Sequence, residues 1–171
     1  MKGGAGKRKG GGFERVVAKL LSLWVTGGRL EDVFWRSSMS GGRATIGRGK
    51  VRQAGDICAV APEGTSLVEH FFIECKAYRR LGIPEFLLRG SGPLATFWKV
   101  AVRESAKYQR VPMLIARQNG LPAFVIMHRQ VLLPFALHSS SKMAQSLIDL
   151  PGDLVMFRFD VMLATRCPWQ S

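Results

Sequence analysis

Two acidic residues and a lysine, placed at the ends of two apolar segments, constrain the fold of this chain more than any other feature. Asp56 stands immediately before the apolar run 57–61. Glu74 and Lys76 stand at the end of a second run, 67–76, which contains Val, Phe and Ile. Runs of this length and composition are typical of buried strands. Side chains alternate between the two faces of a strand, so Glu74 and Lys76 share one face. A buried strand has no structural use for an acid and an amine side by side.

The segment between the two runs predicts a hairpin. Residues 62–66 include a proline, which presets its own φ, and a glycine, which tolerates a positive one. A symmetric four-residue loop would turn Asp56 away from Glu74, whereas a loop of five residues gives the two side chains a shared face. We therefore expect 62–66 to be the loop, with Asp56 opposite Phe72 and diagonal to Glu74.

These residue types suit the metal-assisted hydrolysis of a phosphodiester. Mg²⁺ prefers hard oxygen ligands and is commonly held by one or two carboxylates, waters and substrate phosphate. Asp56 and Glu74 can supply the carboxylates and the backbone carbonyl of Cys75 another oxygen. The expected ion is Mg²⁺, and the sequence leaves Mn²⁺ open as an alternative. Lys76 can orient the attacking water and offset negative charge that develops on the phosphate. The alternative interpretation is structural: a Glu74–Lys76 ion pair at a strand end, with Asp56 as a turn residue.

The charge of the chain favours a polyanionic partner. Its 171 residues include 25 Lys and Arg against 12 Asp and Glu, a net charge of +13. Four basic residues lie within the first ten positions, so +9 remains on the rest of the chain. The excess is therefore spread over the folded body, as in proteins that bind nucleic acids. Ribosomal-type and membrane-surface proteins share this trait, so charge alone does not identify an enzyme.

Composition indicates one globular domain. Hydrophobic residues make up 47% of the chain and charged residues 22%, and a chain of this length can bury a sizeable core. No apolar run reaches membrane-spanning length and the start lacks an apolar leader, so we expect no membrane partner and a cytoplasmic location. The three cysteines are far apart and odd in number, which favours core packing over a zinc site.

The remaining periodicities predict an α/β fold, with a central mixed β-sheet flanked by helices. The order along the chain is a helix, three strands, a second helix and two strands. Helices are expected at 13–24, around 84–88 and from Pro93 onward, and the further strands at 33–36, 113–116 and 123–127.

The chain divides into three parts on composition. Residues 1–12 read as a basic disordered tail, residues 13–130 as the main domain, and residues 131–171 as an extension of the same domain that can serve as a dimer interface. Within the extension we expect a strand at 131–135, a helix at 142–150 and a strand at 154–159.

A glycine-rich, basic segment at 37–54 predicts contacts with a nucleic-acid backbone. Glycine permits close approach and arginine neutralises phosphate, so the segment suits an arm that grips DNA. The alternative is a solvated loop with no partner. The predicted DNA-binding residues of the whole chain are Lys7, Arg8, Lys9, Arg36, Arg43, Arg48, Lys50, Arg52, Arg79 and Arg80.

Glu14 lies at the border of the apolar stripe of the first helix and has two interpretations. An acid in a first helical turn is favoured by the helix dipole alone. The functional interpretation makes Glu14 a third carboxylate, which leans over the sheet toward the metal. Its position in the sequence leaves both open.

These features together resemble the PD-(D/E)xK nuclease superfamily and, within it, the small Holliday junction resolvases of archaea and bacteriophages. The resemblance covers residues 9–128 and implies an αβββαβ core. It rests on Lys9-Gly10 ahead of Phe13-Glu14, on Trp35-Arg36 followed by Ser40-Gly41-Gly42, on Gly55-Asp56-Ile57 and on Ile73-Glu74-Cys75-Lys76. One departure is that Gly55, rather than the proline of the superfamily's name, precedes Asp56.

The resemblance also implies roles for these residues. The metal ligands or their supports would be Glu14, Asp56 and Glu74. Lys76 would be the catalytic amine, and Ser40 would lie near the scissile phosphate, with Ser37 and Ser38 as competitors for that place. Enzymes of this kind are homodimers that place two sites across a four-way junction and cut paired strands symmetrically. If a phage encodes the chain, it would act in the host cytoplasm.

Three functions therefore compete. The first is a metal-dependent, structure-selective DNA endonuclease of the junction-resolvase type. The second is a restriction or repair endonuclease that acts on other branched or linear DNA. The third is a basic DNA- or RNA-binding module in which the acid-x-Lys pattern is incidental. Metal-dependent nicking of a four-way junction separates the third from the others, and comparison with linear duplex separates the first two.

Overall fold

The computed structural model describes residues 4–37, 54–133 and 145–169, with side chains from residue 11 onward. Its first element is the long helix α1, Gly4–Val25, which buries one stripe made of Phe13, Val17, Leu21 and Trp24. The stripe follows the expected helical period. The helix begins earlier than expected, because the segment predicted to be a disordered tail is helical from Gly4.

A five-stranded mixed sheet forms the centre of the molecule, as the sequence predicts. Its strands lie in the order β3-β4-β5-β7-β6, so β3 and β6 are the two edges. β3 pairs with β4 in parallel and all other neighbours are antiparallel. The bounds are β3 Phe71–Tyr78, β4 Val111–Gln118, β5 Phe124–His128, β6 Ile148–Leu150 and β7 Leu154–Arg158.

A separate two-stranded antiparallel sheet stands beside the free edge of β3. It consists of β1, Phe34–Arg36, and β2, Ile57–Ala59, with Trp35 opposite Cys58. The predicted hairpin between β2 and β3 is therefore wrong, because β2 pairs with β1 instead.

The segment between β2 and β3 is helical rather than a five-residue turn. It contains the 3-10 turn η2, Pro62–Gly64, and the short helix α2, Thr65–His70. Pro62 occupies a first helical position, where its missing N–H costs nothing. The apolar pair Leu67 and Val68 is buried from a helix. A short apolar run fits a buried strand and a buried helix equally well, which explains the error.

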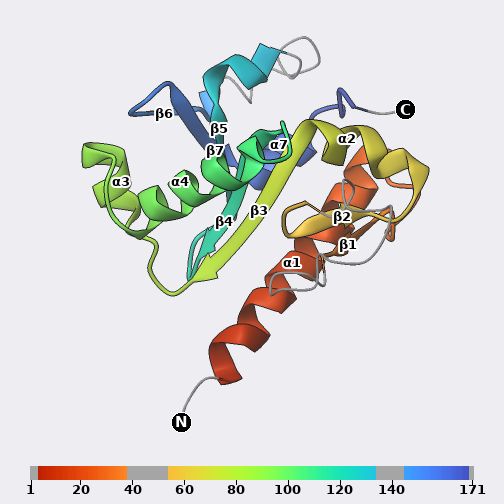
Figure 1. Cartoon of the computed structure of the whole chain (residues 1–171), viewed down its shortest axis with the longest axis horizontal. Coiled ribbons are helices and arrows are strands. Elements are labelled where there is room, and N and C mark those ends of the chain that lie inside the picture. Colours follow the sequence, from red (N-terminus) through yellow and green to blue (C-terminus); the bar gives the residue numbers. More distant parts are fainter. Residues whose placement is uncertain (1–3, 38–53, 134–144, 170–171) are drawn as a thin grey trace.

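Helices cover the two faces of the sheet (Figure 1). On one face, α1, β1, β2, α2 and the helix α7, Phe159–Leu163, share a core with the odd-numbered residues of β3 and β4 such as Ile73 and Met113. On the other face, α3, Ile83–Arg89, and α4, Pro93–Ala106, pack on even-numbered residues such as Leu114. The predicted short helix near 84–88 and the helix that starts at Pro93 are both confirmed.

The C-terminal part extends the same sheet, with β7 beside β5 and β6 at the far edge. Its local predictions are correct only for β7. Residues 129–132 form the 3-10 turn η3, Arg129–Leu132, where a strand was expected, and residues 148–150 form β6 where a helix was expected. Long-range pairing with β7, which sequence periodicity does not report, decides the conformation of β6.

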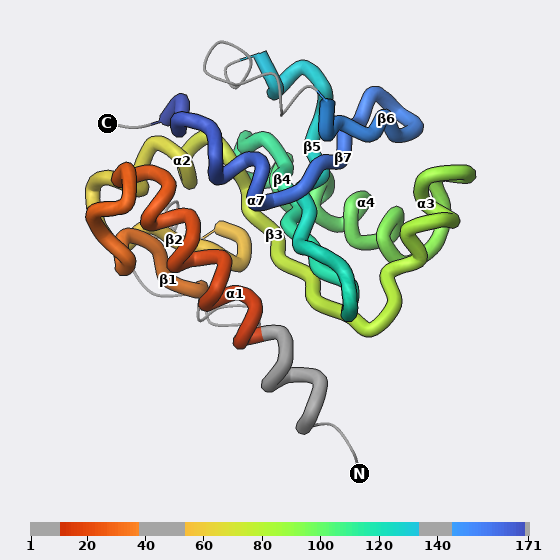
Figure 2. Tube along the Cα trace, turned by 180° about the vertical axis from the view of Figure 1, so that it is seen from behind, coloured from red at the N-terminus to blue at the C-terminus, as the bar shows by residue number. Residues whose placement is uncertain are grey.

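Figure 2 shows the same arrangement from behind. The strand β3 crosses the middle of the molecule, with α1 and the β1–β2 pair on one side and α3 and α4 on the other. Among the described residues, no helix is long and apolar enough to cross a membrane.

Candidate active site

Asp56 is held against the free edge of β3 by two hydrogen bonds. Its backbone N–H donates to the carbonyl of Ile73 at 2.8 Å, and its carboxylate Oδ2 accepts from the N–H of Cys75 at 2.8 Å. Gly55 makes this approach possible, because its φ is +86° and a Cβ there would lie 2.6 Å from the Ile73 carbonyl oxygen. The Asp56 side chain is thus buried and fixed beside the strand that carries the other two site residues.

Glu74 and Lys76 project from the same face of β3, as their alternation predicts. The Lys76 ammonium donates a hydrogen bond to Glu74 Oε1 and lies 3.9 Å from Asp56 Oδ2. The face of the Phe97 ring on α4 packs 5.7 Å from the same ammonium. The amine therefore stands between the two carboxylates, so the three residues that the sequence singles out do meet. The hydrogen bond from the Cys75 N–H to the Asp56 carboxylate brings them together, and β2 and β3 do not pair as strands.

The charges of the three groups are strongly interdependent. Burial raises the pKa of the Asp56 carboxyl above its ordinary value, although the Cys75 N–H and Lys76 oppose this shift. Burial also raises the pKa of Glu74, and repulsion from Asp56 raises it further. Burial acts to lower the pKa of Lys76, but Glu74 and Asp56 outweigh it, so that pKa is raised. One amine thus balances two buried carboxyls incompletely, and an additional cation would relieve the excess negative charge.

Glu14 on α1 faces the same cluster. Its Oε2 lies 3.8 Å from Arg36 Nε on β1. Burial and repulsion from Asp56 raise the pKa of Glu14, while Arg36 lowers it. Gly11, one helical turn earlier, packs directly against the Arg36 guanidinium. Because α1 begins at Gly4, Glu14 lies in the middle of the helix and not in its first turn, so the helix-dipole interpretation is wrong. The role of Glu14 as a third carboxylate of the site stays a prediction.

The donor set suits a hard divalent cation. Within the described parts of the chain, no group of three His, Cys, Asp or Glu side chains could hold a metal ion. Two carboxylates supplemented by a backbone carbonyl and waters are nevertheless a common Mg²⁺ arrangement. The Cys75 carbonyl leaves the strand on the same edge as its N–H, toward Asp56. Its thiol points to the face of β3 opposite Glu74 and Lys76 and packs in the core, where burial and the neighbouring carboxylates raise the pKa of Cys75. The Lys76 ammonium lies between the two carboxylates, which shows that the space between them accepts a positive charge. The residues present therefore fit a divalent metal ion.

The structure describes only some of the residues predicted to contact DNA. Arg79 and Arg80 follow β3 and are exposed just past the site. The segment with Lys7, Arg8 and Lys9 belongs to α1, and its side chains lie outside the described set. The remaining predicted residues lie outside the described parts of the chain: Ser40, Arg43, Arg48, Lys50 and Arg52.

Ser37, named from the sequence as a competitor of Ser40, lies next to Asp56. Its N–H donates to the Asp56 carbonyl at 2.7 Å, which extends the β1–β2 pairing by one position. Its hydroxyl is buried and, among the described residues, has no hydrogen-bond partner. Ser37 directly follows the last residue of β1, Arg36. Three nearby serines made the choice ambiguous.

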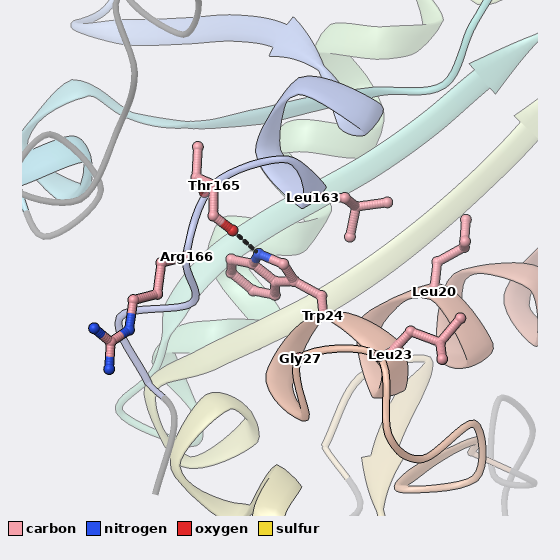
Figure 3. Close-up of a pocket in the computed structure, with 8 residues that line it drawn as sticks. Leu20, Leu23, Trp24, Gly27, Leu163, Thr165 and Arg166 are labelled. Carbon is pink, nitrogen blue, oxygen red and sulfur yellow. Dashed lines mark hydrogen bonds between the residues drawn. The ribbon is translucent and has the colours of Figure 1, made fainter.

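A hollow with a volume of about 380 Å³ lies between the end of α1 and the segment after α7 (Figure 3). Trp24 donates from its indole Nε1 to the Thr165 carbonyl at 2.8 Å along its wall. Its lining is mainly apolar and contains no acid. Trp24 lies ten residues, or about 15 Å of helix, from Glu14, so this hollow is separate from the carboxylates.

Comparison with known families gives a clear result. The family described as "Phage putative PDDEXK endonuclease" matches residues 5–162, which is most of the chain. The chain belongs to this family. The match spans α1, both sheets and all three site residues, and it makes the protein a nuclease of the PD-(D/E)xK superfamily with a phage relationship. No curated protein and no solved structure matches the chain.

Proposed function

We propose that this phage-type endonuclease is a Holliday junction resolvase, which hydrolyses phosphodiesters in four-way DNA junctions with Mg²⁺ or Mn²⁺. The observation that carries the chemistry is the meeting of Asp56, Glu74 and Lys76 at the free edge of β3. A bound divalent ion would activate water and stabilise charge on the phosphate. Asp56, Glu74 and the Cys75 carbonyl would hold it.

The residues of the chain divide the remaining work. Glu14 adds negative charge beside Asp56, and Arg36 favours the ionised form of Glu14 by lowering its pKa. If Asp56 and Glu74 bind a metal ion, the Lys76 ammonium can turn toward the attacking water and the phosphate. Arg79 and Arg80 continue the basic surface beyond the site and are suited to contacts with the DNA backbone.

Junction selectivity would follow from a two-fold homodimer. Resolution requires cuts in two strands of like polarity, and one site cuts one strand, so two symmetric sites match the symmetry of the junction. Within the C-terminal extension, Met156 and Phe159 are buried in the core of the protomer, so other surfaces would form the interface. In an infected cell the enzyme would meet branched phage DNA in the host cytoplasm.

The decisive experiment offers a four-way junction, a three-way branch and a linear duplex of the same sequence, each with Mg²⁺ and with EDTA. The proposal expects metal-dependent paired cuts in the four-way junction and little cutting of the duplex. Glu74→Gln should bind the junction and cut at least about a hundredfold more slowly, because it loses charge but keeps its volume. Equal cutting of duplex would favour the restriction or repair alternative. Binding without cutting by the wild-type chain would favour a non-catalytic module.

The homodimer has its own test. Light scattering should report twice the chain mass at micromolar concentration. On a cruciform plasmid, both cuts should occur within one binding event, so that linear product appears before nicked circles accumulate. A monomer mass together with nicked circles as the main early product would contradict the dimer.

A further inference from the structure

Trp35 is an exposed aromatic side chain next to the candidate active site. It keeps 62% of its surface accessible, whereas Trp24 and Trp98 are buried and Trp169 packs against His70 and Phe71. Large exposed apolar surface is unfavourable for folding. An isolated exposed side chain is common, so exposure alone assigns nothing.

The backbone at Trp35 is held by strand pairing and hydrogen bonds. Residues 34–36 pair with 57–59 in full register, and the Cys58 thiol donates to the Trp35 carbonyl. The N–H of Ser37 bonds the Asp56 carbonyl at the next position. Phe34 and Arg36 are directed at the core and at Glu14 on α1, so alternation turns Trp35 to the opposite, open face. The ring is therefore displayed by a fixed strand.

The position of Trp35 relative to Asp56 is set by this register. Trp35 is opposite Cys58, and Asp56 lies two residues before Cys58, so the two are diagonal neighbours. Diagonal neighbours in an antiparallel pair are about 7–8 Å apart. Stacked nucleotides advance by about 3.4 Å along a strand. If a phosphate lies at Asp56, a base one or two nucleotides away would therefore be close enough to contact the Trp35 indole.

We propose that Trp35 is a stacking platform for a nucleobase that has left the helix beside the scissile phosphate. The proposal rests on the proposed nuclease function and specifies its substrate class: DNA in which a base near the cut is unstacked, as at a branch point. Aromatic rings hold bases by stacking without regard to sequence, whereas a fully paired duplex hides both faces of every base. Phosphate contacts cannot make this distinction, so Trp35 adds selectivity for structure that the basic residues lack.

Fluorescence tests the contact directly. The difference between wild-type protein and Trp35→Phe isolates the emission of Trp35, since the other three tryptophans are common to both. Both proteins carry Glu74→Gln and are measured in EDTA, with a four-way junction or a duplex of the same arms. The junction should quench the emission of Trp35 and shield it from acrylamide, and the duplex should do neither. Unchanged emission with the junction would overturn the proposal, as would a Trp35 already shielded from acrylamide in the free protein.

Affinity tests the energetic role. Trp35→Ala should weaken junction binding about tenfold and duplex binding less than twofold, because stacking is lost only where a base is free. Trp35→Phe keeps an aromatic face and should retain most of the affinity, while Trp35→Leu, apolar but not aromatic, should behave as Trp35→Ala. Leu88→Ala is the matched control: Leu88 is 81% exposed on α3, at the other end of the molecule from β1 (Figures 1 and 2), and should change nothing.

The outcomes separate this proposal from the proposed function. Equal weakening of junction and duplex by Trp35→Ala, or full affinity in Trp35→Leu, would remove the stacking role. If wild-type protein cuts no DNA but Trp35 responds to the junction, the nuclease mechanism fails and the platform stands. If junctions are cut normally by Trp35→Ala, the platform alone fails. Circular dichroism of each variant confirms folding, which an exposed position should preserve.

Discussion

The carboxylate of Asp56, at the start of the two-stranded sheet, accepts a hydrogen bond from the backbone N–H of Cys75 in the central sheet. Asp56 precedes β2 of the two-stranded sheet, and Cys75 lies in β3 of the central sheet. One side chain thus joins the two sheets and fixes the distance between the proposed metal ligands. The same oxygen cannot be removed without affecting both stability and chemistry.

Two substitutions of Asp56 can distinguish its structural role, the hydrogen bond to Cys75, from its proposed role in metal binding. Asp56→Ala leaves the buried Cys75 N–H unpaired and should cost about 1–3 kcal/mol of unfolding free energy. Asp56→Asn keeps an oxygen acceptor and should be at least as stable as wild type without metal, because burial already disfavours the charged form. Both variants should lose cleavage. Urea unfolding in EDTA at neutral pH measures the difference, and a large loss of stability in Asp56→Asn would contradict it.

Lys76 should have opposite effects on metal binding and on catalysis. Its ammonium neutralises Glu74 and Asp56 in the metal-free site and competes with an added cation. Lys76→Met should tighten Mn²⁺ binding severalfold, yet slow cleavage at least about a hundredfold. Glu74→Gln should weaken both. Calorimetric titration with Mn²⁺, compared with single-turnover cleavage rates, distinguishes these patterns. Weaker Mn²⁺ binding by Lys76→Met would show that the amine supports the metal rather than replacing it.

Stability should depend on pH in a direction set by the carboxyls. Asp56 and Glu74 both have a pKa raised in the folded protein. Their contribution to stability is therefore fully present below the ordinary carboxyl pKa, about 4, and is lost as pH rises through the raised values. The raised pKa of Lys76 adds a further loss only in the alkaline range.

Metal binding should reverse this loss. Because Mg²⁺ requires ionised carboxylates, the increase in melting temperature on adding Mg²⁺ should be larger at about pH 8 than at about pH 5. The double variant Asp56→Asn/Glu74→Gln should show no increase at either pH. Scanning calorimetry with EDTA or Mg²⁺ provides the measurement, and an increase that is equal at both pH values would argue against these two residues as ligands.

Gly55 should tolerate no side chain, because a Cβ there would collide with the Ile73 backbone. A comparison with Gly28 separates this collision from backbone strain. Gly28 has a φ of +88°, close to the +86° of Gly55, but nothing lies within 4 Å of a Cβ there. Gly28→Ala should lose about 1–2 kcal/mol from backbone strain alone. Gly55→Ala should lose a further 1–3 kcal/mol, roughly, because its methyl group collides with the Ile73 backbone. It should also lose metal binding. Equal losses in the two variants would contradict the close approach.

The basic segment that follows β1 should act on affinity through charge. Arg43 and Arg48 were selected from the sequence as phosphate contacts. Replacing both with Ala should lower the slope of log affinity against log salt by about two units and leave sequence preference unchanged. Replacing Arg103, which pairs with Glu104 on α4, with Ala is the control and should leave the slope unchanged. An unchanged slope in the double variant would remove the segment from the interface.

Sequence patterns predicted local features of the chain better than the long-range contacts that bring Asp56 to β3. The Glu74–Lys76 alternation and the helix beginning at Pro93 follow from local periodicity, and both are confirmed. The helix α2 and the strand β6 were missed because short apolar runs take their conformation from distant partners. The meeting of Asp56 with β3 depends on a side-chain-to-backbone bond, which no periodic pattern encodes.

Electrostatic partners were the least visible part of the site. Arg36 was assigned to DNA on charge alone, whereas it also lies 3.8 Å from Glu14. That pair joins α1 to β1 across 22 positions of the sequence. The close packing of Gly11 against Arg36 shows how the helix admits the guanidinium. Only the crossing of α1 over β1 in three dimensions brings these residues together.

The backbone at Gly55 also bears on how relatives of this enzyme can be recognised. A proline holds φ near −65°, so it cannot occupy a position that requires +86°. The Pro-Asp and Gly-Asp forms are therefore two different ways of delivering the same carboxylate. A single exchange of one residue for the other would break the approach before a compensating change could arise. Lineages that use glycine here should keep it, and searches that insist on the proline will overlook them.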